Sequence, residues 1–255
     1  MKRYIHVMFL FAFCFNSDSF GVLLYDIDFS PPIHVVGSQM TVGYGPIPRN
    51  TPTEVWAGQQ IVVSSYSYLT QQPIKMVPGD PSVGGDYRYS QFELDLSTFN
   101  YPIYRLDLDM CLEKMKINSW DGFSITFDVP TVVRLDFENN GTISEYNPHN
   151  IIGLYNQGEL LSMSILVNLL TNTWDIRCNS QHLYTGQFFY PVPANPDLPT
   201  YIRSIRFNLV DDLDYSDIPV SAIDNIKVQG IPEPSTLLLL GLGVPILSGF
   251  LRRKK

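Results

Sequence analysis

Hydrophobic and polar residues alternate strictly along the middle of this chain. In residues 104–110 every second side chain is apolar and each one between is charged, and residues 133–138 repeat the pattern. Successive side chains of a strand point to opposite faces of a sheet, so this period of two predicts half-buried antiparallel strands. After the second run, Asn139-Asn140-Gly141 predicts a hairpin turn, because Asn and Gly tolerate positive φ. The chain is therefore predicted to be built from sheets.

The other regular segments support the same prediction. Alternating or apolar runs predict further strands at residues 25–29, 60–66, 87–97, 123–129, 160–168, 173–178, 182–189, 201–210 and 222–229. Segments rich in Pro, Gly and polar residues predict loops at 31–56, 70–86 and 191–200. About a dozen short strands without an amphipathic helix predict one all-β domain over residues 22–230, an antiparallel β-sandwich of the jelly-roll class.

The first 21 residues do not follow this pattern. Lys2 and Arg3 precede the apolar stretch 7–15, and small residues lie just before position 21. A positive start, a short apolar core and small residues at its end are typical of a secretory signal peptide. We therefore expect residues 1–21 to direct export and to be removed.

A second apolar segment lies near the C-terminus. The run 236–251 is almost long enough to cross a bilayer as a single helix. The chain then ends in four basic residues, Arg252, Arg253, Lys254 and Lys255. Basic residues after a span stay on the cytoplasmic side, so this cluster is predicted to act as a stop-transfer signal that holds the helix in the inner membrane.

The tail as a whole resembles a known sorting signal. Pro232-Glu233-Pro234, a following Ser-Thr, a Leu-rich span with glycines and a basic end stand in the order of the PEP-CTERM signal, so residues 231–255 resemble that family. The resemblance implies that exosortase, a membrane cysteine protease of bacteria that make extracellular polysaccharide, removes the tail near the tripeptide. It also implies a transient inner-membrane intermediate, then display at the cell surface or release into a polysaccharide matrix. The alternative is an adhesin that stays anchored by its own tail.

Charge limits the partners of the exported part. Residues 22–231 carry 11 basic and 23 acidic side chains, a net charge near −12. Proteins that bind nucleic acid or anionic lipid need a basic face. Nucleic acid is therefore not an expected partner, whereas a solvated extracellular protein fits this charge.

Two segments inside the domain resemble lectin sandwiches. Residues 173–179 with 182–184 are similar to a hairpin of concanavalin A-like and laminin-G-like domains, and 222–228 resembles the closing strand of jelly-roll domains that precede this sorting signal. The resemblance implies a lectin-like sandwich but identifies no ligand by itself. Extracellular polysaccharide is an expected partner because of the matrix that the sorting signal implies. Exposed aromatic rings offer an apolar face to a sugar. Trp56 and Trp120, in loop-like surroundings, are the candidates for glycan binding.

Residues 92–98 resemble the catalytic strand of laminarinase-type glycosidases. Glu93 and Asp95 share one face of the predicted strand, but Thr98 stands where the second catalytic Glu belongs. Without that acid, no group protonates the leaving oxygen. We therefore expect a protein that is not an enzyme, with Glu93 and Asp95 on the solvated face of a strand. A secreted glycan-active enzyme with another motif is the alternative.

An acidic segment follows the strand predicted at 201–210. It contains Asp211, Asp212, Asp214 and Asp217. Calcium takes several carboxylate oxygens from such a loop, although the spacing does not fit an EF-hand. A solvated acidic loop is the simpler interpretation, and calcium is the one cofactor that the sequence leaves open.

Two cysteines remain after removal of the signal peptide. Cys111 follows two aspartates on the polar face of its strand, whereas Cys178 follows Trp174 and Ile176 on an apolar face. Side chains on unlike faces do not meet, so the alternation argues against a disulfide that an exported protein could otherwise form.

Overall fold

The computed structural model describes residues 21–79, 87–113, 122–128, 133–146, 150–187, 201–212 and 219–233. The predicted signal peptide, except Gly21, and the apolar tail lie outside these residues. Within the described part, no helix is long and apolar enough to cross a bilayer.

The described residues form fifteen strands and no helix. The strands are β1 (Val22–Ile27), β2 (Glu54–Ala57), β3 (Gln59–Val62), β4 (Ile74–Val77), β5 (Tyr87–Asp95), β6 (Ile103–Glu113), β7 (Gly122–Asp128), β8 (Val133–Glu138), β9 (Thr142–Glu145), β10 (Asn150–Leu154), β11 (Leu160–Asn168), β12 (Thr173–Cys178), β13 (Gln181–Gln187), β14 (Ser204–Asp212) and β15 (Val220–Ile231). Every region predicted as a strand overlaps one of them.

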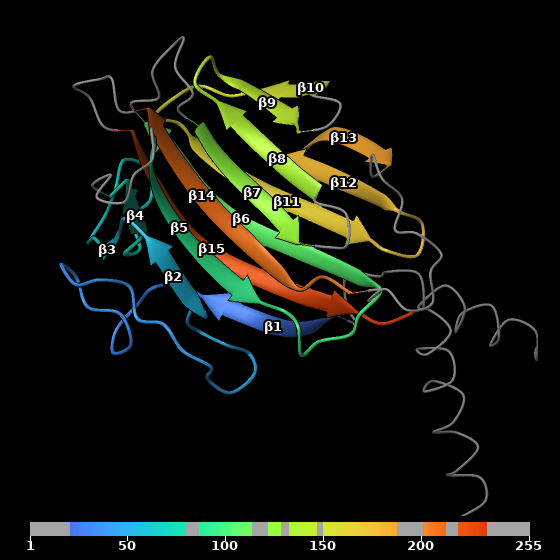
Figure 1. Cartoon of the computed structure of the whole chain (residues 1–255), viewed down its shortest axis with the longest axis horizontal. Helices are drawn as coiled ribbons and strands as arrows, with labels where there is room; N and C mark the ends of the chain where they lie inside the picture. Colours follow the sequence, from blue (N-terminus) through green and yellow to red (C-terminus); the bar gives the residue numbers. More distant parts are fainter. Residues whose placement is uncertain are drawn as a thin grey trace, which may run out of the picture.

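These strands form two antiparallel sheets. The eight-stranded sheet has the order β13-β12-β11-β6-β15-β4-β3, with β1 also on β15, and the seven-stranded sheet has the order β10-β9-β8-β7-β14-β5-β2. The long strands of the two sheets run along similar diagonals, one layer over the other (Figure 1). The predicted antiparallel β-sandwich is confirmed.

Two of the predicted loops were partly wrong. The segment 31–56 runs into β2, and the segment 70–86 contains β4. Both strands are four residues long, and β4 is flanked by Pro73 and Pro78. Proline lacks the N–H that a sheet requires, so a segment rich in proline is predicted as a loop even where it contains a short strand.

The core fills the space between the sheets with the apolar halves of the alternating strands. Phe92 of β5 stacks on Phe207 of the neighbouring β14, with ring centroids 4.6 Å apart. Trp174 of β12 is 1% exposed and meets the ring of Tyr184 edge-on. Each fully buried side chain of this size contributes roughly 1.5–3 kcal/mol to folding. The alternation that defined the strands therefore also supplies the core.

A buried cation fixes the long segment that follows β1. The Nη1 atom of Arg49 donates to the hydroxyl of Tyr25 (2.8 Å) and to the carbonyl of Asp95 (2.9 Å). Its Nη2 atom is 3.4 Å from the Thr98 hydroxyl, the position at which the glycosidase strand has an acid. Burial raises the pKa of Tyr25 to about 12, so its hydroxyl remains a neutral partner. Asp95 and Thr98 therefore serve the packing of this segment.

The two cysteines are free, and both are buried. Cys178 belongs to the main core, whereas Cys111 lies in a separate small cluster with Leu69 and Ala222. The prediction that they face opposite sides and stay unpaired is confirmed. Cys111 is nevertheless fully buried, because the segment around Leu69 covers that patch of the outer face.

Strand β15 changes partner at a bulge. Residues Ser221–Ile223 pair with β4, and the later part of β15 pairs with β1. Between them lie Asp224 and Asn225, where the ladder to β6 is interrupted and Asn225 has a φ of 53°. The Asn225 side chain donates to Asp109 on β6 (2.9 Å). Asn tolerates this left-handed backbone better than most residues.

Burial at the bulge shifts the ionisation of Asp224. Burial, with the nearby carboxylates of Asp109 on β6 and Asp28 after β1, raises the pKa of Asp224 to about 7, while the N–H of Asn225 opposes the shift. The folded state therefore binds a proton that the unfolded state has lost above its pKa of 3.8. This contribution to stability is complete below that pKa and is lost as the pH rises through about 7.

We predict that the free energy of unfolding falls between pH 5 and pH 7, by at most about 1.4 kcal/mol per pH unit from this group. Asp224→Asn, which mimics the protonated acid, should flatten this dependence, and Asp109→Asn should shift it to lower pH. Urea denaturation across this range measures it. Equal slopes for the wild type and Asp224→Asn would contradict the assignment.

Candidate functional site

A groove of about 510 Å³ crosses the outer face of the seven-stranded sheet. Its lining comes from Tyr89 and Gln91 of β5, Ser124 and Thr126 of β7, Arg134 of β8, Tyr146 after β9, and Arg206, Asn208 and Val210 of β14. Strands β8, β7, β14 and β5 are consecutive neighbours in the sheet. At about 4.8 Å between strands, the groove spans about 14 Å.

Strand register builds the floor of the groove. Asn208 on β14 is paired with Gln91 on β5 and with Ser124 on β7. The residues on either side of Asn208 point into the core, because side chains alternate along β14. The Asn208 amide lies 3.4 Å from the Ser124 hydroxyl, to which it donates. Three neutral groups that can both donate and accept hydrogen bonds therefore lie in one row.

Aromatic rings stand at the edges of this row. Tyr89 and Tyr146 are 49% and 53% exposed, which is high for side chains of their size. The guanidinium of Arg134 lies over the Tyr146 ring, 4.8 Å from its centroid, and the Tyr146 N–H donates to the Arg134 carbonyl (3.0 Å). Both contacts hold the Tyr146 ring in place while it stays accessible. Such a ring offers an apolar face and a polar hydroxyl at once.

The two arginines of the groove have acidic neighbours. The Nε atom of Arg134 is 2.6 Å from Asp136 Oδ1, and Arg206 is the ladder partner of Glu93. The Nε atom of Arg206 is buried and makes no hydrogen bond to the described residues. The groove is thus close to neutral, and it contains one donor that a ligand could satisfy.

Glu93 lies on the same outer face, on β5, and is half-buried. Burial raises its pKa, and the carboxylates of Glu54 and Asp128 add to the shift. A hydrogen bond from Ser204 and the charge of Arg206 act in the opposite direction. The predicted place of Glu93 on the outer face is confirmed, although the face is less solvated there than the sequence predicts.

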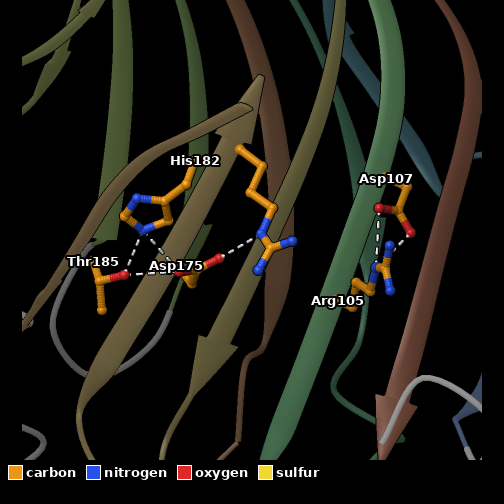
Figure 2. A network of polar contacts seen from close by, with 6 residues as sticks. Arg105, Asp107, Asp175, His182 and Thr185 are labelled. Carbon is orange, nitrogen blue, oxygen red and sulfur yellow. Dashed lines mark hydrogen bonds and ion pairs between the residues drawn. The ribbon is translucent and has the colours of Figure 1, made fainter. Parts of the chain in front are cut away.

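The outer face of the eight-stranded sheet carries a network of charged side chains (Figure 2). Asp175 accepts from Thr185 (2.7 Å) and lies 3.1 Å from His182 and 3.2 Å from Arg177. Burial pushes the pKa of Asp175 up, but the hydrogen bonds from Thr185 and Arg177 outweigh it and lower the pKa below its usual value. On β6, Arg105 pairs with Asp107 at 2.9 Å.

This face also has a depression of about 600 Å³, which is larger than the groove. Its lining includes Asp109, whose carboxylate already accepts from Ser162 (2.5 Å) and Asn225 (2.9 Å). No aromatic ring contributes to the lining. Arg105 pairs with Asp107 inside the lining, and Arg177 and Lys227 have their acidic partners just outside it, so the depression is a weaker candidate than the groove.

The acidic segment predicted as a loop is partly strand. Strand β14 continues to Asp212, so Asp211 and Asp212 lie in the sheet. Asp211 is fully buried, because it lies on the core-facing side of β14. It forms a salt bridge to Arg88 Nη2 at 2.7 Å. Asp214 and Asp217 lie outside the described residues. Among the described residues, no group of three or more His, Cys, Asp or Glu could hold a metal ion.

The two tryptophans predicted for glycan binding are not placed by the structure. Trp56 lies in β2, but its side chain is outside the described part, as is Trp120 entirely. The exposed aromatic residues that the structure does place on one face are tyrosines. Tyr89 stands in an alternating run, and that alternation alone could have marked it as outward-facing.

The end of β15 leads directly into the tripeptide. Ile231 is the last residue of the strand, and Pro232 and Glu233 follow it, while Pro234 and the basic cluster Arg252–Lys255 lie outside the described residues. Residues 230–255 match the PEP-CTERM protein-sorting motif. The tail is therefore an export and cell-surface sorting signal of this family. No curated protein sequence matches the chain.

Solved structures resemble the sandwich. The binding domain of botulinum neurotoxin DC, solved with rat synaptotagmin II, has a TM-score of 0.52 at 11% identity, over 88% of this chain and 51% of its own. The cellulose induced protein Cip1 has a TM-score of 0.50 at 11% identity, over 80% of this chain and 95% of its own. A sialidase matches with a TM-score of 0.49 at 13% identity, over 72% of this chain and 19% of its own. The chain spans about half of the neurotoxin domain, and these likenesses concern the fold alone.

Proposed function

We propose that this protein is an exported polysaccharide-binding protein that is not an enzyme, and that exosortase processes it for display at the cell surface or release into a polysaccharide matrix. The observation that carries the binding proposal is the groove across the seven-stranded sheet. It combines two exposed tyrosines with a row of neutral hydrogen-bonding side chains.

The chemistry of the groove fits an uncharged sugar chain. Sugar rings present apolar C–H faces, which suit Tyr89 and Tyr146, and hydroxyls, which suit Gln91, Ser124 and Asn208. The arginines have acidic neighbours, so they offer little net charge to a polyanion. The acidic exported part would also repel a polyanion.

A glycan-active enzyme is the second candidate, and Glu93 is the observation that favours it. Its pKa is raised, as in the proton donors of glycosidases, and it lies on the same outer face as the groove. Against catalysis, the groove lining itself contains no carboxylate, and the Thr98 hydroxyl contacts Arg49. We therefore place Glu93 beside the bound chain and give it no chemical step.

Tyr146→Ala should weaken binding to a neutral polysaccharide by about two- to tenfold, which corresponds to roughly 0.5–1.5 kcal/mol for one aromatic contact. Asn208→Ala should weaken it as well. Retardation in native gels containing hydroxyethylcellulose, xyloglucan or dextran measures the affinity. Tyr68→Ala is the matched control, because Tyr68 is 63% exposed but does not line the groove.

Binding should change little with salt and should not extend to polygalacturonate, since Asp136 is paired with Arg134 and Glu93 lies near Arg206. The polysaccharide should keep its length during the incubation. Equal retardation of the wild type and both groove variants would contradict the binding site. Chain shortening that is lost in Glu93→Gln would instead support the enzyme.

The sorting proposal predicts different failures for two tail variants. In cells with exosortase, the exported wild type should lack Thr236–Lys255. Replacement of Glu233 should leave the tail inserted but uncut, because one carboxylate outside the span hardly changes insertion. Replacement of Arg252–Lys255 by Gln should weaken the stop and misplace the protein. Intact mass and membrane fractionation measure both, and a full tail retained by the wild type and by both variants would mean that the tail is an ordinary anchor.

A further inference from the structure

Both ends of the sandwich domain leave it at the same place. Strand β1 is antiparallel to β15, and its first residue, Val22, is paired with Gly230, one residue before the end of β15 (Figure 1). The segment before Val22 and the segment after Ile231 therefore start side by side.

The last strand is held firmly up to the sorting motif. Ile231 is paired with Ile103 on β6 and is only 8% exposed. The ring of Tyr101 lies directly on Gly230, where a Cβ atom would be 2.2 Å from the ring. Tyr101 also meets Tyr104 edge-on, with ring centroids 6.2 Å apart. No flexible linker separates the folded domain from Pro232.

A hollow opens beside the motif, lined by apolar side chains together with the polar Asn100. Its volume is about 530 Å³, and its lining includes Tyr101, Pro102, Leu169, Leu170 and the motif residues Pro232 and Glu233. Leu170 is 55% exposed at the turn after β11. Glu233 is the one charged residue of the lining.

We propose that this end of the sandwich, formed by Tyr101, Pro102, Leu169 and Leu170, rests on the lipid–water interface of the membrane that holds the tail. The apolar run begins at Thr236, three residues after Glu233. Three residues span at most about 11 Å, so an inserted tail brings the hollow to the headgroups. Tyrosine is enriched at that depth, and exposed leucine gains from contact with the acyl boundary.

The contact sets the height of the cleavage site. With β15 paired up to Ile231 and the hollow on the lipid, the tripeptide is held at a constant distance above the membrane. The inference rests on the proposed insertion of the tail. Exosortase is the other possible occupant of the hollow, and the experiment separates it from lipid.

The test uses the tail-bearing protein in phosphatidylcholine nanodiscs, with an environment-sensitive fluorophore on Leu170→Cys. The control is Leu154→Cys, which is 76% exposed at the end of β10, before the chain turns to the opposite end of β11. Cys111 and Cys178 are buried and should not react. Lipids with a nitroxide headgroup should quench the label at 170 strongly and the label at 154 little.

Each outcome has one meaning. Copurification with nanodiscs reports insertion of the tail, and its failure overturns both the proposed sorting route and this inference. Copurification with equal, weak quenching at both positions overturns the inference alone. If the label at 170 changes only after inactive exosortase is added, the hollow binds the protease and the lipid contact is overturned. Loss of quenching in Leu169→Ser, with insertion unchanged, would support the contact further.

Discussion

The backbone pairing of β15 is the constraint on which the rest of the sandwich depends. This last strand pairs with β6 on both sides of its bulge, at Val220–Asp224 and at Lys227–Ile231, and its other edge is shared by β4 and β1. The first strand therefore pairs with the last strand of the domain, and long-range pairing of this kind is slow to form. The same strand runs without a linker into the sorting motif, so one strand both holds the sandwich together and positions the motif.

The candidate site follows from the order of the other sheet. Strands β5 and β14 are far apart in the sequence but adjacent in space, and their register sets Gln91 beside Asn208. The core side of these strands is apolar, so their polar residues can only gather on the outer face. Acids near both arginines of the groove leave it suited to neutral hydroxyls. On the outer face of the eight-stranded sheet, Asp175 instead forms ion pairs with His182 and Arg177 (Figure 2).

The sequence predicted the parts of the fold that depend on local alternation, including β11 and β12 with their bounds. It missed β2, β4 and β10 and indicated β9 only through the hairpin turn, because such short strands are stabilised by pairing with neighbouring strands. The sorting motif was readable because it is contiguous. The groove could not be predicted from the sequence, since no local pattern tells which strands become neighbours. Tyr146, after β9, and Arg206, on β14, line the same groove only because β8 and β7 lie between those strands in the sheet. Asp211 was misplaced because its partner, Arg88, lies on another strand.

The most direct test of the binding proposal is a structure of the sandwich with a neutral oligosaccharide bound. We expect the sugar rings against Tyr89 and Tyr146, with hydroxyls in contact with Gln91, Asn208 and the Nε atom of Arg206. A sugar bound instead on the eight-stranded face, near Asp109 and Arg177, would contradict the account.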